Sequence, residues 1–122
     1  MPRECGKVSQ HLEIGIPASA ILSMAQHESM ELIIMGSRGL GTIKEHLLGS
    51  VSHRVATHAS CHVLLVKAPV VPFNNILLPI EHSLDAEWAV EFSSQKPFRG
   101  TPHITVLHVI PFAQPILPIG AL

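Results

Sequence analysis

Gly36-Ser-Arg-Gly-Leu-Gly-Thr-Ile-Lys-Glu-His-Leu-Leu-Gly-Ser50 is the stretch of this 122-residue chain that decides its fold. It follows an apolar run over 32–35 and ends where a helical pattern begins. Glycine lets the backbone approach an anion closely, and the first N–H groups of a helix face it. The spacing, G-x2-G-x9-G-S, matches neither the Rossmann fingerprint nor the P-loop. Spacing alone leaves two interpretations open: a phosphate site, or glycines that only permit a tight turn.

The sequence around this stretch predicts alternating strands and helices. Residues 7–14 mix polar and apolar side chains and predict a strand, and apolar runs predict strands over 30–35 and 62–66. Helical periodicity predicts helices over 17–28 and 50–58, with a short helical turn near 43–48. Pro17 suits the first turn of its helix, where the missing N–H would be unpaired anyway. The first part of the chain therefore predicts an α/β arrangement.

The pattern restarts after residues 68–74, whose two prolines predict a stiff linker. Strands are expected over 75–80 and 103–109, with a helix between them. Ser83 is the expected N-cap of that helix, and Pro97 should end it. Its Leu84, Trp88 and Phe92 share one helical face, and we expect Trp88 to anchor this helix against a sheet.

Composition narrows the class of protein. The chain is 47% hydrophobic and 14% charged with a net charge of −1, which favours a buried sheet and gives no basic surface for nucleic acid. Cys5 and Cys61 make no disulfide framework, which suits a reducing cytoplasm. The first residues show no apolar signal region and no stretch has the length of a membrane span, so we expect a cytoplasmic protein without a membrane partner.

The glycine spacing resembles the nucleotide-binding motif of the universal stress protein family, and the likeness runs over residues 6–67. Residues 14–22 resemble the junction of the family's strand 3 with its following helix, 31–36 resemble strand 4, and 61–67 resemble strand 5. Residues 76–83 resemble strand 1 and its turn, and 107–111 the end of strand 2. This resemblance implies a three-layer α/β fold with a five-stranded parallel sheet in the order 3-2-1-4-5, like the adenine nucleotide alpha hydrolases.

The elements therefore occur in the order 3-4-5 and then 1-2. We expect residues 1–67 to be the end of one such domain, 68–74 a linker, and 75–122 the start of a second domain. A tandem protein cut across its middle would give this order, and Met1 would then be an artificial or interrupted start.

Strand 1 lies mid-sheet in the family, so strands 3–5 leave a gap that strands 1 and 2 must fill. A chain filling its own gap must descend about 20 Å and move about 10 Å sideways. The seven linker residues reach only about 24 Å when fully extended, and a helix layer stands in the way. We therefore expect an intertwined homodimer in which two copies exchange these halves.

The resemblance also implies a ligand, ATP or another adenine nucleotide, with Mg²⁺. Arg38 lies inside the loop, where its guanidinium could meet a phosphate. Glu81 stands where the family usually has aspartate, and it is either a ligand contact or a solvated loop acid. In an exchanged dimer each site would be composite. The residues implied on the phosphate and sugar side are Met35, Gly36, Arg38, Gly39, Gly49, Ser50, Val51 and Ser52; those implied around adenine and ribose are Pro79, Ile80, Glu81 and Val109.

The sequence gives little support for a metal site in the protein or for catalysis. The scattered histidines have no zinc-finger spacing, so we expect no protein metal site. We assign no catalytic residue or water-positioning group, so any ATP hydrolysis should be slow. Two alternatives stay open, a dimerisation or interaction module of the same fold that has lost its ligand, and a fragment that folds without function.

Overall fold

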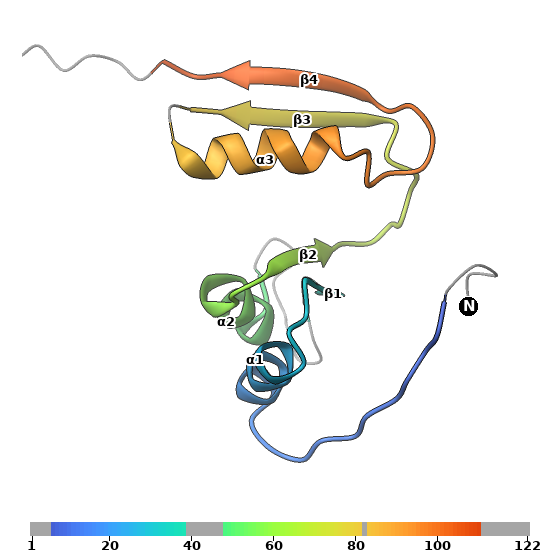
Figure 1. The fold of residues 1–122 in the computed structure, drawn as a ribbon, viewed down its shortest axis with the longest axis vertical. Coiled ribbons are helices and arrows are strands. Elements are labelled where there is room, and N and C mark those ends of the chain that lie inside the picture. Colours follow the sequence, from blue (N-terminus) through green and yellow to red (C-terminus); the bar gives the residue numbers. More distant parts are fainter. Residues whose placement is uncertain (1–5, 39–47, 82, 111–122) are drawn as a thin grey trace, which may run out of the picture. The chain divides into compact units, whose positions relative to one another are not determined.

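The computed structural model describes residues 6–38, 48–81 and 83–110, and the chain divides into two compact units, 1–70 and 71–122. Unit 1 holds helix α1 (Pro17–His27), strand β1 (Leu32–Gly36), helix α2 (Ser50–His58) and strand β2 (His62–Val66). Unit 2 holds strand β3 (Asn75–Ile80), helix α3 (Leu84–Ser94) and strand β4 (His103–His108). Figure 1 shows these elements in chain order. The predicted α/β fold with parallel strands is confirmed.

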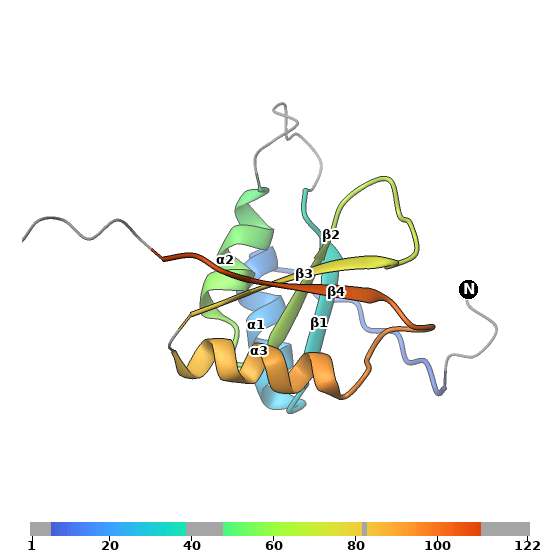
Figure 2. The same ribbon diagram turned by 90° about the horizontal axis from the view of Figure 1, so that it is seen from above.

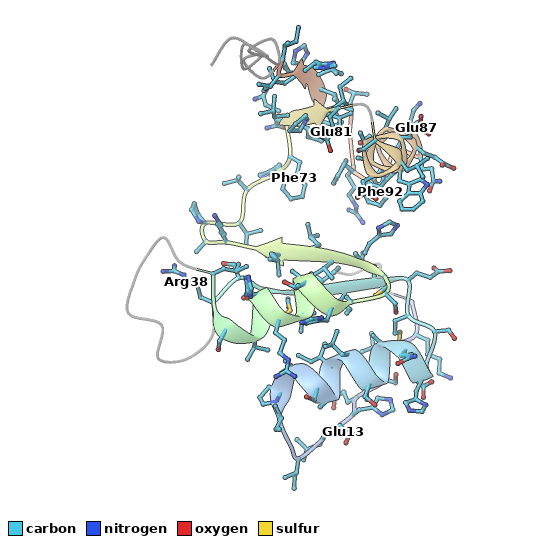
Figure 3. All side chains as sticks on the ribbon, turned by 90° about the vertical axis from the view of Figure 1, so that its left-hand side faces the viewer. Glu13, Arg38, Phe73, Glu81, Glu87 and Phe92 are labelled. Carbon is cyan, nitrogen blue, oxygen red and sulfur yellow. The ribbon has the colours of Figure 1, made fainter. Side chains whose placement is uncertain are left out.

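Unit 1 is a parallel strand pair with both helices on one side. β1 pairs with β2 from Leu32 opposite His62 to Gly36 opposite Val66. α1 contacts α2, and α2 contacts β2, so the helices lie on the same face of the pair (Figure 3). Val55 is fully buried at 0% exposure, and Ala18 and Ala25 of α1 are also buried. Small side chains on α1 let the two helices pack closely around Val55.

The two faces of β1 differ in burial. Ile33 and Met35 are half-buried, whereas Leu32 and Ile34 are 44% and 64% exposed. Because side chains alternate along a strand, Leu32 and Ile34 point away from α1 and α2. We call the side that these two residues line the open face of β1. Parallel strands are normally covered on both faces, so an apolar open face is incomplete packing for this class of sheet.

Unit 2 is a second parallel strand pair with one helix. β3 pairs with β4 from Asn75 opposite His103 to Ile80 opposite His108, and α3 contacts β3 (Figure 2). The predicted N-cap is confirmed, since the Ala86 N–H donates to Ser83 Oγ at 3.2 Å. α3 ends at Ser94, three residues before Pro97, and the residue before a proline is disfavoured in the helical region.

An aromatic cluster ties the end of α3 to the start of unit 2. The Phe98 ring meets Phe73 edge-on at 5.4 Å and Phe92 at 6.3 Å between ring centroids. Edge-on pairs of this kind add roughly 0.5–1.5 kcal/mol to the free energy gained by burial. Phe73 therefore belongs structurally to unit 2, although it lies in the proline-containing segment 68–74.

Three expectations differ from the structure. Residues 6–14 form no strand. Leu12 and Ile14 are 94% and 100% exposed, and within the described residues no strand pairs with this segment to supply the ladder that a strand needs. Trp88 does not anchor α3, because it is 59% exposed while Ala86 and Ala89 on another face are half-buried. β1 begins at Leu32 rather than at residue 30.

Two other expectations remain predictions. The predicted turn near 43–48 lies almost wholly outside the described residues. The described strands form two separate two-stranded sheets, so the five-stranded sheet remains a prediction.

No helix in the described part of the chain has both the length and the apolar character needed to cross a membrane.

Candidate functional site

The two ends of the glycine-rich segment are joined by hydrogen bonds at the carboxyl end of β1. The Gly49 N–H donates to the Ser37 carbonyl oxygen at 2.8 Å. The Ser52 hydroxyl lies 2.6 Å from the same oxygen and 3.0 Å from the Gly49 carbonyl oxygen. Ser37 and Ser52 are 4% and 2% exposed. We call Ser37, Gly49 and Ser52 the serine clasp; it fixes the end of β1 against the start of α2.

β1 itself holds the clasp in register with the sheet. The Ser37 N–H donates to the Val66 carbonyl oxygen at 3.0 Å, one residue beyond the last strand pair. Ser37 is therefore bonded on both sides, to β2 through its N–H and to the clasp through its carbonyl. The position of the α2 N-terminus is thus set by the sheet.

Gly49 lies at a crowded position. Its φ of −63° and ψ of 152° are open to any residue. An added Cβ would, however, lie 3.3 Å from each of three atoms, the Arg38 Cα, the Ser37 carbonyl oxygen and the Ser52 Oγ. A Cβ at this position would require these neighbours to shift by a few tenths of an ångström, so the glycine has a packing role beyond permitting a turn.

The start of α2 offers backbone donors. Gly49 is the N-cap and makes no side-chain cap. The N–H groups of Ser50 and Val51 lie in the first helical turn, where no partner exists within the helix. Ser50 is exposed and Val51 is half-buried. Such N–H groups, together with the helix dipole, favour a bound anion at this position.

The remaining predicted residues of unit 1 lie on the strand that leads to the clasp. Met35 is half-buried and pairs with Leu65, and Gly36 ends β1. Arg38 is exposed and lies at the same edge as the start of α2 (Figure 3). Gly39 lies outside the described residues. The described residues predicted on the phosphate side therefore gather at the carboxyl end of the β1–β2 pair.

In unit 2 the other four predicted residues line one cleft. It has a volume of about 410 Å³, within the usual range for small-molecule sites, and is open to solvent. It lies where β3 and β4 end and α3 begins, and Figure 3 shows Glu81 at this end of β3. The cleft is lined by the predicted Pro79, Ile80, Glu81 and Val109 together with Asp85, Ala86, Ala89 and Leu107.

Several residues of the serine clasp and of the cleft were not predicted from the sequence. Ser37 carries no sequence signal of its own, because its role depends on Ser52, fifteen positions away. Ala86 and Ala89 could have been found from the sequence, because residues three apart share one face of a helix. Two small side chains on that face allow the helix to approach a strand closely. Asp85 adds a second carboxylate beside Glu81, and it also lies in the first turn of α3, where an acid complements the helix dipole.

The described residues contain no group of three or more His, Cys, Asp or Glu side chains placed to hold a metal ion. Cys61 is a half-buried free thiol at the start of β2.

The clasp predicts a stability effect at Ser52. Ser52→Ala removes a buried hydroxyl whose one hydrogen is shared between two carbonyl oxygens, and it should lower the free energy of unfolding by about 1–2 kcal/mol. Urea denaturation followed by circular dichroism measures the change. Ser23→Ala, at an exposed position on α1, is the control and should change stability by less than about 0.5 kcal/mol. An unchanged midpoint for Ser52→Ala would mean that the clasp contributes nothing to stability.

Comparison with known proteins gives matches to one family. A model of the "Universal stress protein family" matches residues 5–67. Universal stress protein YxiE of Bacillus subtilis is 47% identical over 53 residues, which are 43% of this chain and 36% of the relative. The "Universal stress protein in QAH/OAS sulfhydrylase 3'region" of Thermus aquaticus is 46% identical over 67 residues, 55% of this chain and 46% of the relative. The chain thus spans less than half the length of these relatives, and the family match includes the serine clasp.

Proposed function

Because the chain belongs to the universal stress protein family, we propose that it binds an adenine nucleotide, ATP with Mg²⁺ in the first instance, in a stress-response role in the cytoplasm. The observation that carries this proposal is the serine clasp, which holds the first-turn N–H groups of α2 at the carboxyl end of β1. Ligands of open parallel α/β sheets lie at this edge. The clasp therefore supports a phosphate position beside Ser50 and Val51.

The cleft of unit 2 supports a position for the base and the ribose of the nucleotide. Its apolar lining by Ile80, Leu107 and Val109 suits a purine ring, and the Glu81 carboxylate can accept hydrogen bonds from ribose hydroxyls. Mg²⁺ would come with the nucleotide and be held chiefly by its phosphates, as is usual for this cation. With no residue assigned to position an attacking water, any hydrolysis should be slow.

A complete site needs the clasp and the cleft at one edge of a single sheet. The functional form that we propose is a homodimer in which each chain supplies the phosphate half of one site and the base half of the other. Such an assembly is intertwined, and its two sites are related by a twofold axis.

The direct test of nucleotide binding uses the purified chain without additions. Nucleotide released by acid and identified by mass spectrometry should be an adenine nucleotide, and calorimetry of the stripped protein should show saturable binding of ATP with Mg²⁺. A stripped, folded dimer that binds no adenine nucleotide would support the alternative function, an interaction module without a ligand. The two neighbouring acids Glu81 and Asp85 in the cleft favour that alternative, because they repel phosphate groups.

Arg38 gives a more specific prediction. Arg38→Ala removes a cation beside the proposed phosphate position, and it should weaken ATP binding roughly tenfold or more without changing the oligomeric mass. Isothermal titration calorimetry measures the affinity. The matched control is Arg54→Ala, an arginine that is also exposed and lies one turn into α2, which should leave the affinity within about twofold. Equal effects of the two substitutions would indicate a general charge effect and would count against a phosphate contact.

A further inference from the structure

A tryptophan lies on the side of α3 that faces away from its strands. Ala86, Ala89 and Ser93 of α3 are half-buried, their spacing is that of one helical face, and α3 contacts β3. Leu84 and Trp88 lie on the opposite face and are 66% and 59% exposed. Neither of these two large apolar side chains contributes to the packing of α3 on β3.

This exposure differs in kind from that of the apolar strand residues. Ile34 and Leu77 are exposed on β1 and β3, where further strands or helices of a larger sheet would cover them. The outer face of α3 points away from the sheet, so enlarging the sheet leaves this face in water. Leu84 and Trp88 are neighbours there, because residues four apart lie side by side on a helix. Adjacent exposed apolar side chains with polar residues around them are typical of protein–protein interaction sites.

Two glutamates share this face with Leu84 and Trp88. Glu87 and Glu91 complete the spacing i, i+3, i+4, i+7, and both are exposed. Like charges four positions apart on a helix repel each other, and no lysine or arginine occurs over residues 83–95 to offset this repulsion. The Glu87–Glu91 pair is therefore unfavourable within α3 itself. We call Leu84, Glu87, Trp88 and Glu91 the acidic–aromatic face.

The charge and shape of the acidic–aromatic face indicate the kind of partner that fits it. Tryptophan is enriched among the residues that dominate binding energy at protein interfaces. Carboxylates beside such a residue are complementary to lysine and arginine on the partner. A straight row of side chains at i, i+3, i+4 and i+7 is matched by a second helix that packs along it. A basic amphipathic helix has all of these properties.

A second copy of this chain does not have them. In a symmetric contact the face would meet itself, and the Glu87 and Glu91 carboxylates of the two copies would oppose one another. Among the described helices α1, α2 and α3, the only lysine or arginine is Arg54 of α2. Nucleic acid and anionic lipid are negatively charged and are repelled by the same carboxylates. The partner is therefore a different protein.

We infer that the acidic–aromatic face of α3 docks a basic amphipathic helix of another protein. The apolar side of that helix covers Leu84 and Trp88, and its lysine or arginine residues pair with Glu87 and Glu91. This surface is separate from the cleft of unit 2, to which α3 contributes Asp85, Ala86 and Ala89. The inference therefore does not depend on nucleotide binding.

Trp88 reports docking directly, because it is the only tryptophan of the chain. The probe is a synthetic peptide of about 18 residues, long enough to form a helix, with leucine on one face, lysine on the other and no aromatic residue. Its addition to the purified full chain should shift the Trp88 emission to shorter wavelength in a saturable way and protect Trp88 from iodide quenching. A matched peptide with glutamate in place of lysine should produce neither effect.

Charge reversal locates the binding on α3. Glu87→Lys combined with Glu91→Lys should weaken binding of the lysine peptide roughly tenfold or more and allow the glutamate peptide to bind. The control combines Glu13→Lys with Glu28→Lys, two exposed acids of unit 1. It changes the net charge by the same amount and should leave the affinity within about twofold. Circular dichroism checks that both variants are folded.

A single substitution gives a second measurement should the reversed chain fail to fold. Trp88→Ala, titrated with a fluorescein-labelled lysine peptide, should lose roughly tenfold in affinity while ATP binding stays as in the unmodified chain. Equal binding of the two peptides, or an unchanged affinity in either variant of α3, would overturn the inference. Protection of Trp88 from iodide in the free protein would also overturn it, because the chain's own assembly would then cover the face. A chain that docks the peptide without binding ATP would contradict the proposed function alone.

Discussion

Ile34→Asp is expected to abolish the proposed dimer. Ile34 lies on the open face of β1 and is 64% exposed within its own chain, so in an isolated chain a carboxylate at this position should change stability by no more than about 0.5 kcal/mol. In the proposed dimer we expect the partner copy to cover this position. Burying an unpaired carboxylate there should cost about 3 kcal/mol or more per chain. Light scattering should then report 13.2 kDa in place of twice that mass.

Val70→Asp is the matched control, because Val70 is 81% exposed and lies in the connection rather than on a strand. It should leave the mass and the unfolding midpoint unchanged. If Ile34→Asp also remained a dimer of unchanged stability, the open face of β1 would be solvent-exposed in the assembly. The covering of this face by a second copy would then be wrong.

Gly49→Val should have the second large effect. The added side chain crowds Ser37, Arg38 and Ser52. Overpacking of this kind typically lowers stability by about 1–3 kcal/mol. The displaced clasp would also misplace the first-turn N–H groups of α2. ATP affinity should therefore fall about 30-fold or more, measured by calorimetry on protein shown to be folded by circular dichroism.

Gly6→Ala provides the comparison, since an added Cβ at Gly6 meets nothing within 4 Å. Both the affinity and the unfolding midpoint should stay as in the unmodified chain. A folded Gly49→Val protein with normal ATP affinity would show that the clasp does not position the phosphate donors. In that case the function would have to rest on the cleft alone.

Local signals predicted most of the elements. Pro17 begins α1, Ser83 caps α3, and the apolar run before Gly36 is β1, because capping chemistry and side-chain periodicity act over only a few residues. The strand expected over 7–14 is absent for the opposite reason. Its side chains suit a strand, but a strand exists only with a neighbour, and none of the described strands pairs with it.

The site was predictable in part. Pro79, Ile80, Glu81 and Val109 line one cleft as a set, since all of them follow or end parallel strands whose carboxyl ends share an edge. The roles of Ser37 and Ser52 were not predictable, because a bond across fifteen residues depends on the path of the loop between them. Trp88 was misplaced because three large apolar residues on α3 suggested a buried face, whereas Ala86 and Ala89 allow the closer approach to β3.

The placement of the clasp and the cleft on separate units has a consequence for the cell. In the proposed dimer a complete pocket arises only when two molecules meet, so its amount rises with the square of the monomer concentration while dimers are scarce. A rise in expression would therefore increase nucleotide-bound protein more than proportionally. The fraction of the protein that holds nucleotide would therefore depend on the protein's own concentration, low at basal synthesis and higher once production increases.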